Sequence, residues 1–63
     1  MNATSAQIAY MEILFQDLGF ARTARNAYLK SKLGRPIIFL DQLTIPEASR
    51  IITGLEKRKE DAS

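Results

Sequence analysis

The chain has 63 residues and a formal net charge of +2, and it contains no cysteine, histidine or tryptophan. This length allows one domain, which buries only about 60% of the surface that its unfolded chain exposes. Without cysteine or histidine it can form no disulfide, no zinc site of the usual kind and no catalytic site that needs a histidine base. No segment has the pattern of a signal peptide or a membrane span, and the lack of cysteine fits a cytoplasmic protein.

The first predicted element is a helix that begins after Thr4. Thr4 and Gln7 have the spacing of a capping box, in which each side chain bonds the backbone N–H of the other residue. We expect the helix to reach about Leu18 and to end at Gly19 in the left-handed conformation. Apolar residues line two sides of it. The core stripe is Ile8, Met11, Leu14, Phe15 and Leu18, and the opposite strip is Ala6, Ala9, Tyr10 and Ile13.

The second predicted helix spans about residues 21–33. Gly34 supplies its C-terminal cap and Pro36 prevents its continuation. The apolar residues 36–40 follow as a short extended segment, because a single run of this length cannot form a sheet alone. Leu43 is expected to turn inward after that segment.

The third predicted helix has the clearest start signal in the chain. Thr44 and Glu47 form a second capping box, with Pro46 in the first turn, where proline costs least. We expect the helix to run to about Lys59. Its core stripe is Ile45, Ala48, Ile51, Ile52 and Leu55. Gly54 lies in mid-helix, where it either marks a close contact or is merely tolerated.

These elements predict an all-α fold. One compact three-helix domain spans residues 4–59, with the short extended segment between its second and third helices. Residues 60–63 are expected to form a flexible polar tail.

Basic residues concentrate in the middle of the chain, since residues 22–35 contain no acid. Within residues 11–29, apolar residues flank a turn glycine in Leu18-Gly19-Phe20, and this stretch resembles a helix-turn-helix. The resemblance implies that the second helix binds DNA. Base contacts would come from Arg22, Thr23, Arg25 and Asn26, and phosphate contacts from Lys30, Lys32 and Arg35. The pattern departs from the family at Arg25, where an apolar core residue is usual, and at Phe15, where a small residue is usual. The alternative is a plain helical hairpin with solvated arginines.

A second resemblance covers residues 7–57. The order of a helix, Leu18-Gly19, Leu33-Gly34, Leu43-Thr44 and a final helix with Ile51-Ile52 and Leu55 is similar to small helical modules of phage proteins. Examples are the GemA-like regulators of Mu-type phages and the tails of some phage recombination proteins. This resemblance implies a role in DNA transactions of mobile elements and transfers no catalytic residue.

The first helix supports a different function. A three-helix core need not cover Tyr10 and Ile13, so a protein partner or a second copy of the chain could bind there. Alternatively, residues 36–40 fold over this strip. The acidic residues are dispersed and no phosphate-binding glycine loop is present, so we expect no enzyme, no cofactor and no metal. We expect no membrane binding because the basic residues do not lie opposite one broad apolar face of a single helix. DNA and a protein partner of the first helix therefore remain the two candidate ligands.

Overall fold

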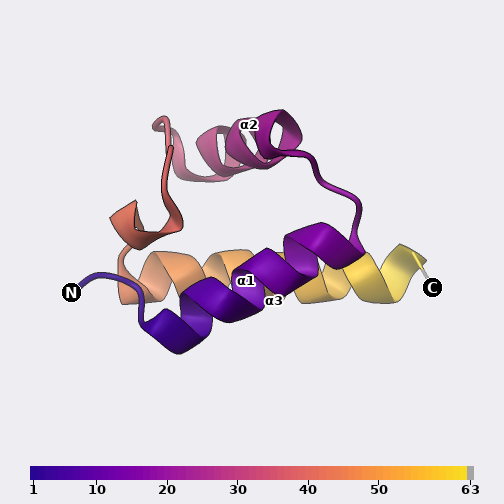
Figure 1. Cartoon of the computed structure of the whole chain (residues 1–63), viewed down its shortest axis with the longest axis horizontal. Helices are drawn as coiled ribbons and strands as arrows, with labels where there is room; N and C mark the ends of the chain where they lie inside the picture. The colour runs from indigo at the N-terminus through magenta and orange to yellow at the C-terminus, as the bar shows by residue number, and fades with distance from the viewer. Residues whose placement is uncertain (63) are drawn as a thin grey trace.

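A computed structural model describes residues 1–62 and contains three α-helices in the predicted order. They are α1 (Ser5–Asp17), α2 (Arg22–Leu33) and α3 (Ile45–Ala62), and a 3-10 turn, η1 (Leu40–Gln42), precedes α3. Helices α1 and α3 lie along each other, and α2 forms a second layer on one side of this pair (Figure 1). The predicted all-α class and the extended segment between the second and third helices are confirmed.

Local sequence signals set the limits of α1 and α2. The hydroxyl of Thr4 accepts a hydrogen bond from the Gln7 backbone N–H at 3.1 Å, and the Gln7 side chain accepts one from the Thr4 N–H at 3.0 Å. Gly19 and Gly34 follow the two helices at φ values of 76° and 74°. Only glycine adopts this left-handed conformation without steric cost, so both predicted helix ends are confirmed.

The second capping box is also present at the start of α3. Glu47 Oε1 accepts a hydrogen bond from the Thr44 N–H at 2.9 Å, and the Thr44 hydroxyl accepts one from the Glu47 N–H at 3.3 Å. The N-terminal residues of the chain form backbone hydrogen bonds with the residues around this box. The Ala3 N–H donates to the Leu43 carbonyl at 2.8 Å, and the Ile45 N–H donates to the Met1 carbonyl at 3.1 Å. The first residues of the chain are therefore tied to the start of α3.

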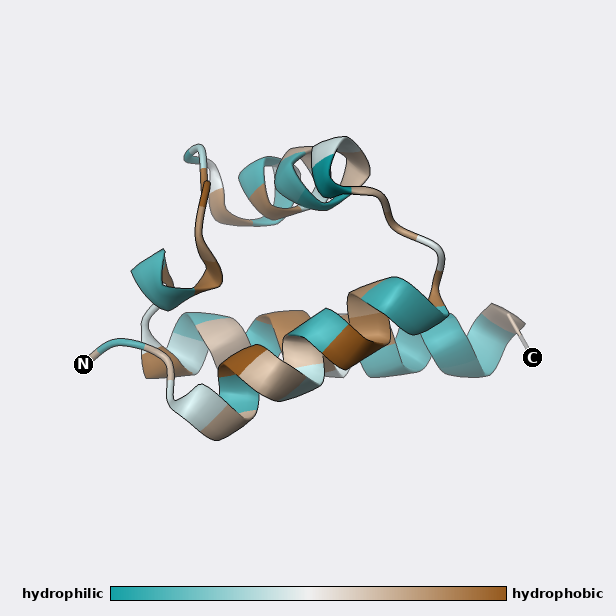
Figure 2. Ribbon diagram, in the orientation of Figure 1, coloured by the Kyte–Doolittle hydropathy of each residue, from teal (hydrophilic) through white to brown (hydrophobic). Residues whose placement is uncertain are grey.

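The core forms between the α1–α3 pair, the inner side of α2 and the segment before α3. Two of its members, Ile37 and Leu40, come from the extended segment and the 3-10 turn, so that segment fills the space between the layers. The buried residues are Met11, Leu14, Phe15, Leu29, Ile37, Leu40, Leu43, Ala48, Ile51 and Leu55. Leu43 is fully buried, as predicted. Figure 2 shows hydrophilic residues along the C-terminal part of α3.

Two expectations from the sequence need correction. Helix α3 continues to Ala62, three residues past its expected end at Lys59. Glu60, Asp61 and Ala62 are therefore helical, whereas we assigned them to a tail at residues 60–63; Ser63 lies outside the described residues. The physical reason is that glutamate and alanine are good helix formers, and a helix already held by packing extends through them and through the single aspartate.

The second correction concerns the alternative in which residues 36–40 fold over the outer strip of α1. They do not cover it: Ile37 and Leu40 point into the core, and Tyr10 and Ile13 remain 40% and 53% exposed. Packing Ile37 and Leu40 inward leaves Ile38 and Phe39 pointing outward, at 54% and 60% exposure. No helix within residues 1–62 is long and apolar enough to cross a membrane.

Candidate nucleic-acid interface

The residues predicted to contact DNA do not gather on one face of α2. Arg22, Thr23 and Lys30 are exposed, and Arg22 lies near the turn that joins α1 to α2. Lys32 is exposed on the flank of α2 that faces α3. At 100° per residue, Lys30 and Lys32 lie on opposite flanks of the helix. The structure therefore divides the predicted set among several surfaces.

Arg25 and Asn26 are half-buried rather than presented outward. Arg25 lies beside Glu12 and Phe15 of α1, at the position where the helix-turn-helix pattern has an apolar residue. Its Nε atom and the Oδ1 atom of Asn26 are buried with no hydrogen-bond partner. Asparagine reads adenine through both polar atoms of its amide, so a buried Oδ1 leaves Asn26 poorly placed to read a base.

Arg35 lies beyond the end of α2 and serves the fold. Its guanidinium forms a forked ion pair with both carboxylate oxygens of Glu47, and it also donates to the Gln42 carbonyl at 3.3 Å. This ion pair and the Thr44 N–H lower the pKa of Glu47 from its ordinary value of 4.5 to about 2. The same pairing raises the pKa of Arg35. We assigned Arg35 to phosphate binding, but its fork is occupied by the capping residue of α3.

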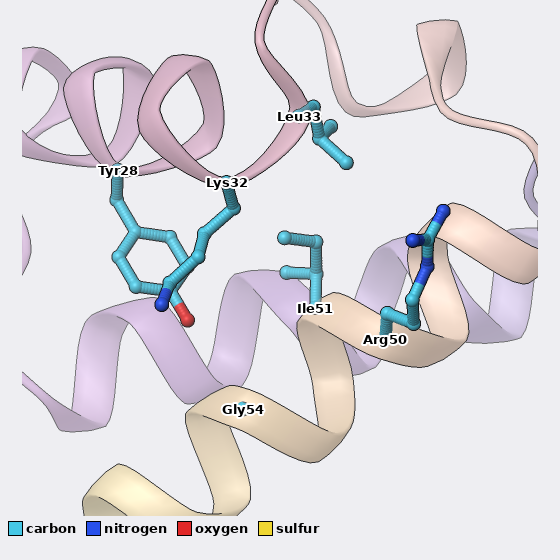
Figure 3. Close-up of a pocket in the computed structure, with 6 residues that line it drawn as sticks. All are labelled: Tyr28, Lys32, Leu33, Arg50, Ile51 and Gly54. Carbon is cyan, nitrogen blue, oxygen red and sulfur yellow. The ribbon is translucent and has the colours of Figure 1, made fainter.

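A different set of basic side chains meets along the seam between α2 and α3, which we call the α2–α3 groove. Lys32 comes from α2, and Arg50, Lys57 and Arg58 come from α3; all of them are exposed. Figure 3 shows one end of the groove, where the side chains of Tyr28 and Lys32 extend from α2 toward α3. The full lining is Tyr28, Lys32, Leu33, Arg50, Ile51, Gly54, Lys57, Arg58 and Asp61.

Tyr28 organises the groove through its aromatic ring. Its ring packs edge-on against Phe15 and Phe20, with centroids 6.0 and 5.7 Å away. The Lys32 ammonium lies 5.7 Å from the Tyr28 centroid, and the Arg58 guanidinium lies 5.6 Å from it and 5.3 Å from the Phe20 centroid. Cation–π attraction of this kind holds both cations near fixed positions.

Gly54 forms the floor of the groove beneath Tyr28. A Cβ atom added at Gly54 would lie 3.0 Å from the Tyr28 hydroxyl oxygen, which is closer than ordinary contact. Of the two roles that the sequence left open for Gly54, the structure supports the first. This glycine marks the close approach of Tyr28 to α3.

Sequence reasoning missed Arg50, Lys57 and Arg58 as candidate binding residues. In the expected third helix they lie outside the core stripe, which was the only criterion applied to that helix. The signal was present in their spacing, since residues 50, 54, 57 and 58 recur at i, i+4, i+7 and i+8 and so share one face of a helix. That this face lies against Tyr28 and Lys32 depends on packing and is not encoded locally.

The outer strip of α1 is the second candidate surface. Ala6, Ala9, Tyr10 and Ile13 are all exposed. The Tyr10 hydroxyl donates a hydrogen bond of 2.6 Å to Glu56 of α3, and this bond raises the pKa of Tyr10. Tyr10 is therefore fixed against α3, while Ile13 has no such tether.

The hollows of the groove are open and small. Two adjoining ones have volumes of about 180 and 280 Å³ and share Tyr28, Lys32 and Gly54. Pockets for small organic ligands usually exceed about 300 Å³ and enclose most of the ligand, so this geometry suits an extended charged chain better. Among residues 1–62, no group of three or more acidic side chains is arranged to hold a metal ion. Comparisons with protein-family models, curated proteins and solved structures found no match to this chain.

Proposed function

We propose that this chain is a non-enzymatic accessory module that binds DNA, of the kind carried by phage and other mobile-element proteins, and that it binds through the α2–α3 groove. The observation that carries the proposal is the meeting of Lys32 with Arg50, Lys57 and Arg58 along one seam. Lysine and arginine that neutralise phosphates supply most of the sequence-independent affinity of proteins for nucleic acids.

The local charge balance supports this choice of surface. Lys59 pairs with Asp17 at 2.8 Å and Arg35 pairs with Glu47, so these two cations are neutralised where they stand. In the groove, the basic side chains face one carboxylate, Asp61, at one end. An anionic ligand would therefore meet a surplus of positive charge there.

The preorganisation of two cations also supports the choice of the α2–α3 groove. An exposed lysine or arginine side chain that moves freely loses rotamer entropy when it binds a phosphate. Lys32 and Arg58 already rest on the Tyr28 and Phe20 rings, so they lose less. The resemblance of residues 7–57 to modules of phage DNA-transaction proteins supports the same class of ligand.

A titration with fluorescently labelled DNA at low and at moderate salt tests the proposal. We expect binding that weakens steeply with salt and that Lys32→Ala reduces several-fold. Lys30→Ala is the matched control, because it removes the same charge from the same helix on the opposite flank, and it should change the affinity little. No binding at low salt would contradict the proposal.

The exposed strip of α1 favours a second candidate function, self-association or binding of a protein partner. Ile13 is 53% exposed on a face whose neighbours are Ala6, Ala9 and Tyr10. Apolar faces of this kind are typical of helix–helix interfaces. If the strip mediates a homodimer, sedimentation of the wild type shows a dimer and Ile13→Asp gives a monomer. A wild type that stays monomeric at high concentration contradicts the homodimer.

A further inference from the structure

We infer that the α2–α3 groove selects single-stranded DNA over duplex DNA. This inference rests on the proposed function and adds the form of the ligand. It follows from three features: the outer face of α2, the burial of polar atoms of Arg25 and Asn26, and the position of the cations along a shallow seam between two helices.

The outer face of α2 lacks the side chains of a duplex-reading helix. Leu29 is the fully buried residue of α2 and marks its inner side. The positions opposite Leu29, at 100° per residue, are Ala24, Ala27 and Ser31, which are exposed and uncharged. A recognition helix enters the major groove with polar and basic residues on its projecting face. Helix α2 projects alanine and serine instead.

The side chains best suited to base edges are turned away from that face. Arginine pairs with guanine and asparagine with adenine through two polar atoms each. The Nε of Arg25 and the Oδ1 of Asn26 are both buried, and Arg25 lines a shallow hollow together with Glu12 and Asp41. Negative side chains beside Arg25 also repel an approaching phosphate. Arg25 and Asn26 are therefore poorly placed to read the base edges of a duplex, which leaves only Arg22 and Thr23 of the predicted base-contact residues exposed at this end of α2.

The cations line a shallow seam that two helices share. From Arg50 to Arg58 the groove follows α3 for about 12 Å, at a rise of about 1.5 Å per residue. Lys32 and Tyr28 form its opposite wall. A single strand is flexible enough to lay its phosphates into such a seam, as strands do in the basic grooves of single-strand binding proteins. Duplex DNA is stiff over about 150 base pairs, so it follows such a seam less readily than a single strand does.

The test compares one short labelled strand of mixed sequence with the same strand annealed to its complement, by fluorescence anisotropy at several salt concentrations. We expect the single strand to bind about tenfold more tightly. With four cations engaged and a slope of about −0.7 per phosphate, log Kd should change with log salt by a slope of about 3 in magnitude. Arg50→Ala and Lys57→Ala should each weaken binding of the single strand, whereas Lys30→Ala should not.

Other outcomes separate the inference from the proposed function. Equal or tighter binding of the duplex overturns the inference and leaves DNA binding intact. Duplex binding that Arg22→Ala or Lys30→Ala weakens would return the site to the outer and N-terminal parts of α2. Failure of both DNA forms to bind at low salt overturns the proposed function itself. Each variant changes an exposed residue, so its helical content, read by circular dichroism, should match that of the wild type.

Discussion

The α1–α3 pair and the α2 layer are held by different kinds of interaction. Both capping boxes lie in the pair, and polar contacts join its helices along their length: the Gln7 amide reaches the Ile45 carbonyl at 3.3 Å, and Lys59 reaches Asp17 at 2.8 Å. Helix α2 has no side-chain cap at its N-cap residue, Ala21, and Leu29 is its only buried residue. The pair is thus a framework, and α2 is a lightly attached wall that contributes one of the four groove cations, Lys32.

This difference has a consequence for function. Segments with few buried contacts open at lower free energy than the core does, and binding surfaces are often drawn from them. The α2–α3 groove lies at this boundary, with one wall on the framework and one on α2. A ligand that bridges the two walls should stabilise α2 against opening, because it binds only when both walls are in place.

Leu29→Ala should lower the free energy of unfolding more than any other change proposed for α2. Truncating a fully buried leucine costs about 2–5 kcal/mol, which approaches the whole stability of a domain this small. If α2 is attached mainly through Leu29, hydrogen exchange of the variant will accelerate in α2 first and leave part of α1 and α3 protected. Leu55→Ala is the matched control in the framework, and it should lower protection in all three helices together. Identical patterns of hydrogen-exchange protection in the two variants would contradict the distinction between the α1–α3 framework and α2.

The limits of the helices could be predicted from the sequence because their determinants are local, whereas the pairing of α1 with α3 does not follow from them. Thr4 with Gln7, Thr44 with Glu47, and the glycines at 19 and 34 each specify a helix end within four residues. The groove could not be predicted in this way, since it depends on how closely Tyr28 approaches Gly54. The base-contact prediction for Asn26 had the same weakness: residue type suggested a role, and packing decided where the polar atoms lie.

A smaller effect is expected where α2 approaches the framework most closely. In a helix interior, alanine is favoured over glycine by about 1 kcal/mol. Gly54→Ala should gain less than this in the wild type, because the new Cβ meets the Tyr28 hydroxyl. In a Tyr28→Phe background the oxygen is gone, and the gain should approach about 1 kcal/mol. Urea denaturation of the four proteins in this cycle measures the difference, and equal gains in both backgrounds would contradict close contact.

The weakest effect on stability should come from the Arg35–Glu47 ion pair, and it should depend on pH. This pair joins the segment after α2 to the start of α3. The pKa of Glu47 falls from 4.5 to about 2 in the folded state, so its ionised form favours folding above about pH 4.5. This contribution should be lost as the pH falls from 4.5 toward 2. Glu47→Gln keeps the capping box but removes the charge. Melting temperatures of the two proteins should therefore converge across this range; a constant difference would contradict the pairing.

Whether single-stranded DNA binds in the α2–α3 groove can be tested directly by amide chemical-shift mapping. The protein is titrated with a short single strand of DNA and followed by NMR. Gly54 is the most informative reporter, because it lies on the floor of the groove. If the groove binds the strand, the largest shifts will occur at Lys32, Gly54 and Lys57, and Thr23 and Ala27 will change little. Shifts concentrated on the outer face of α2 or on Tyr10 and Ile13 of α1, with Gly54 unchanged, would contradict the claim.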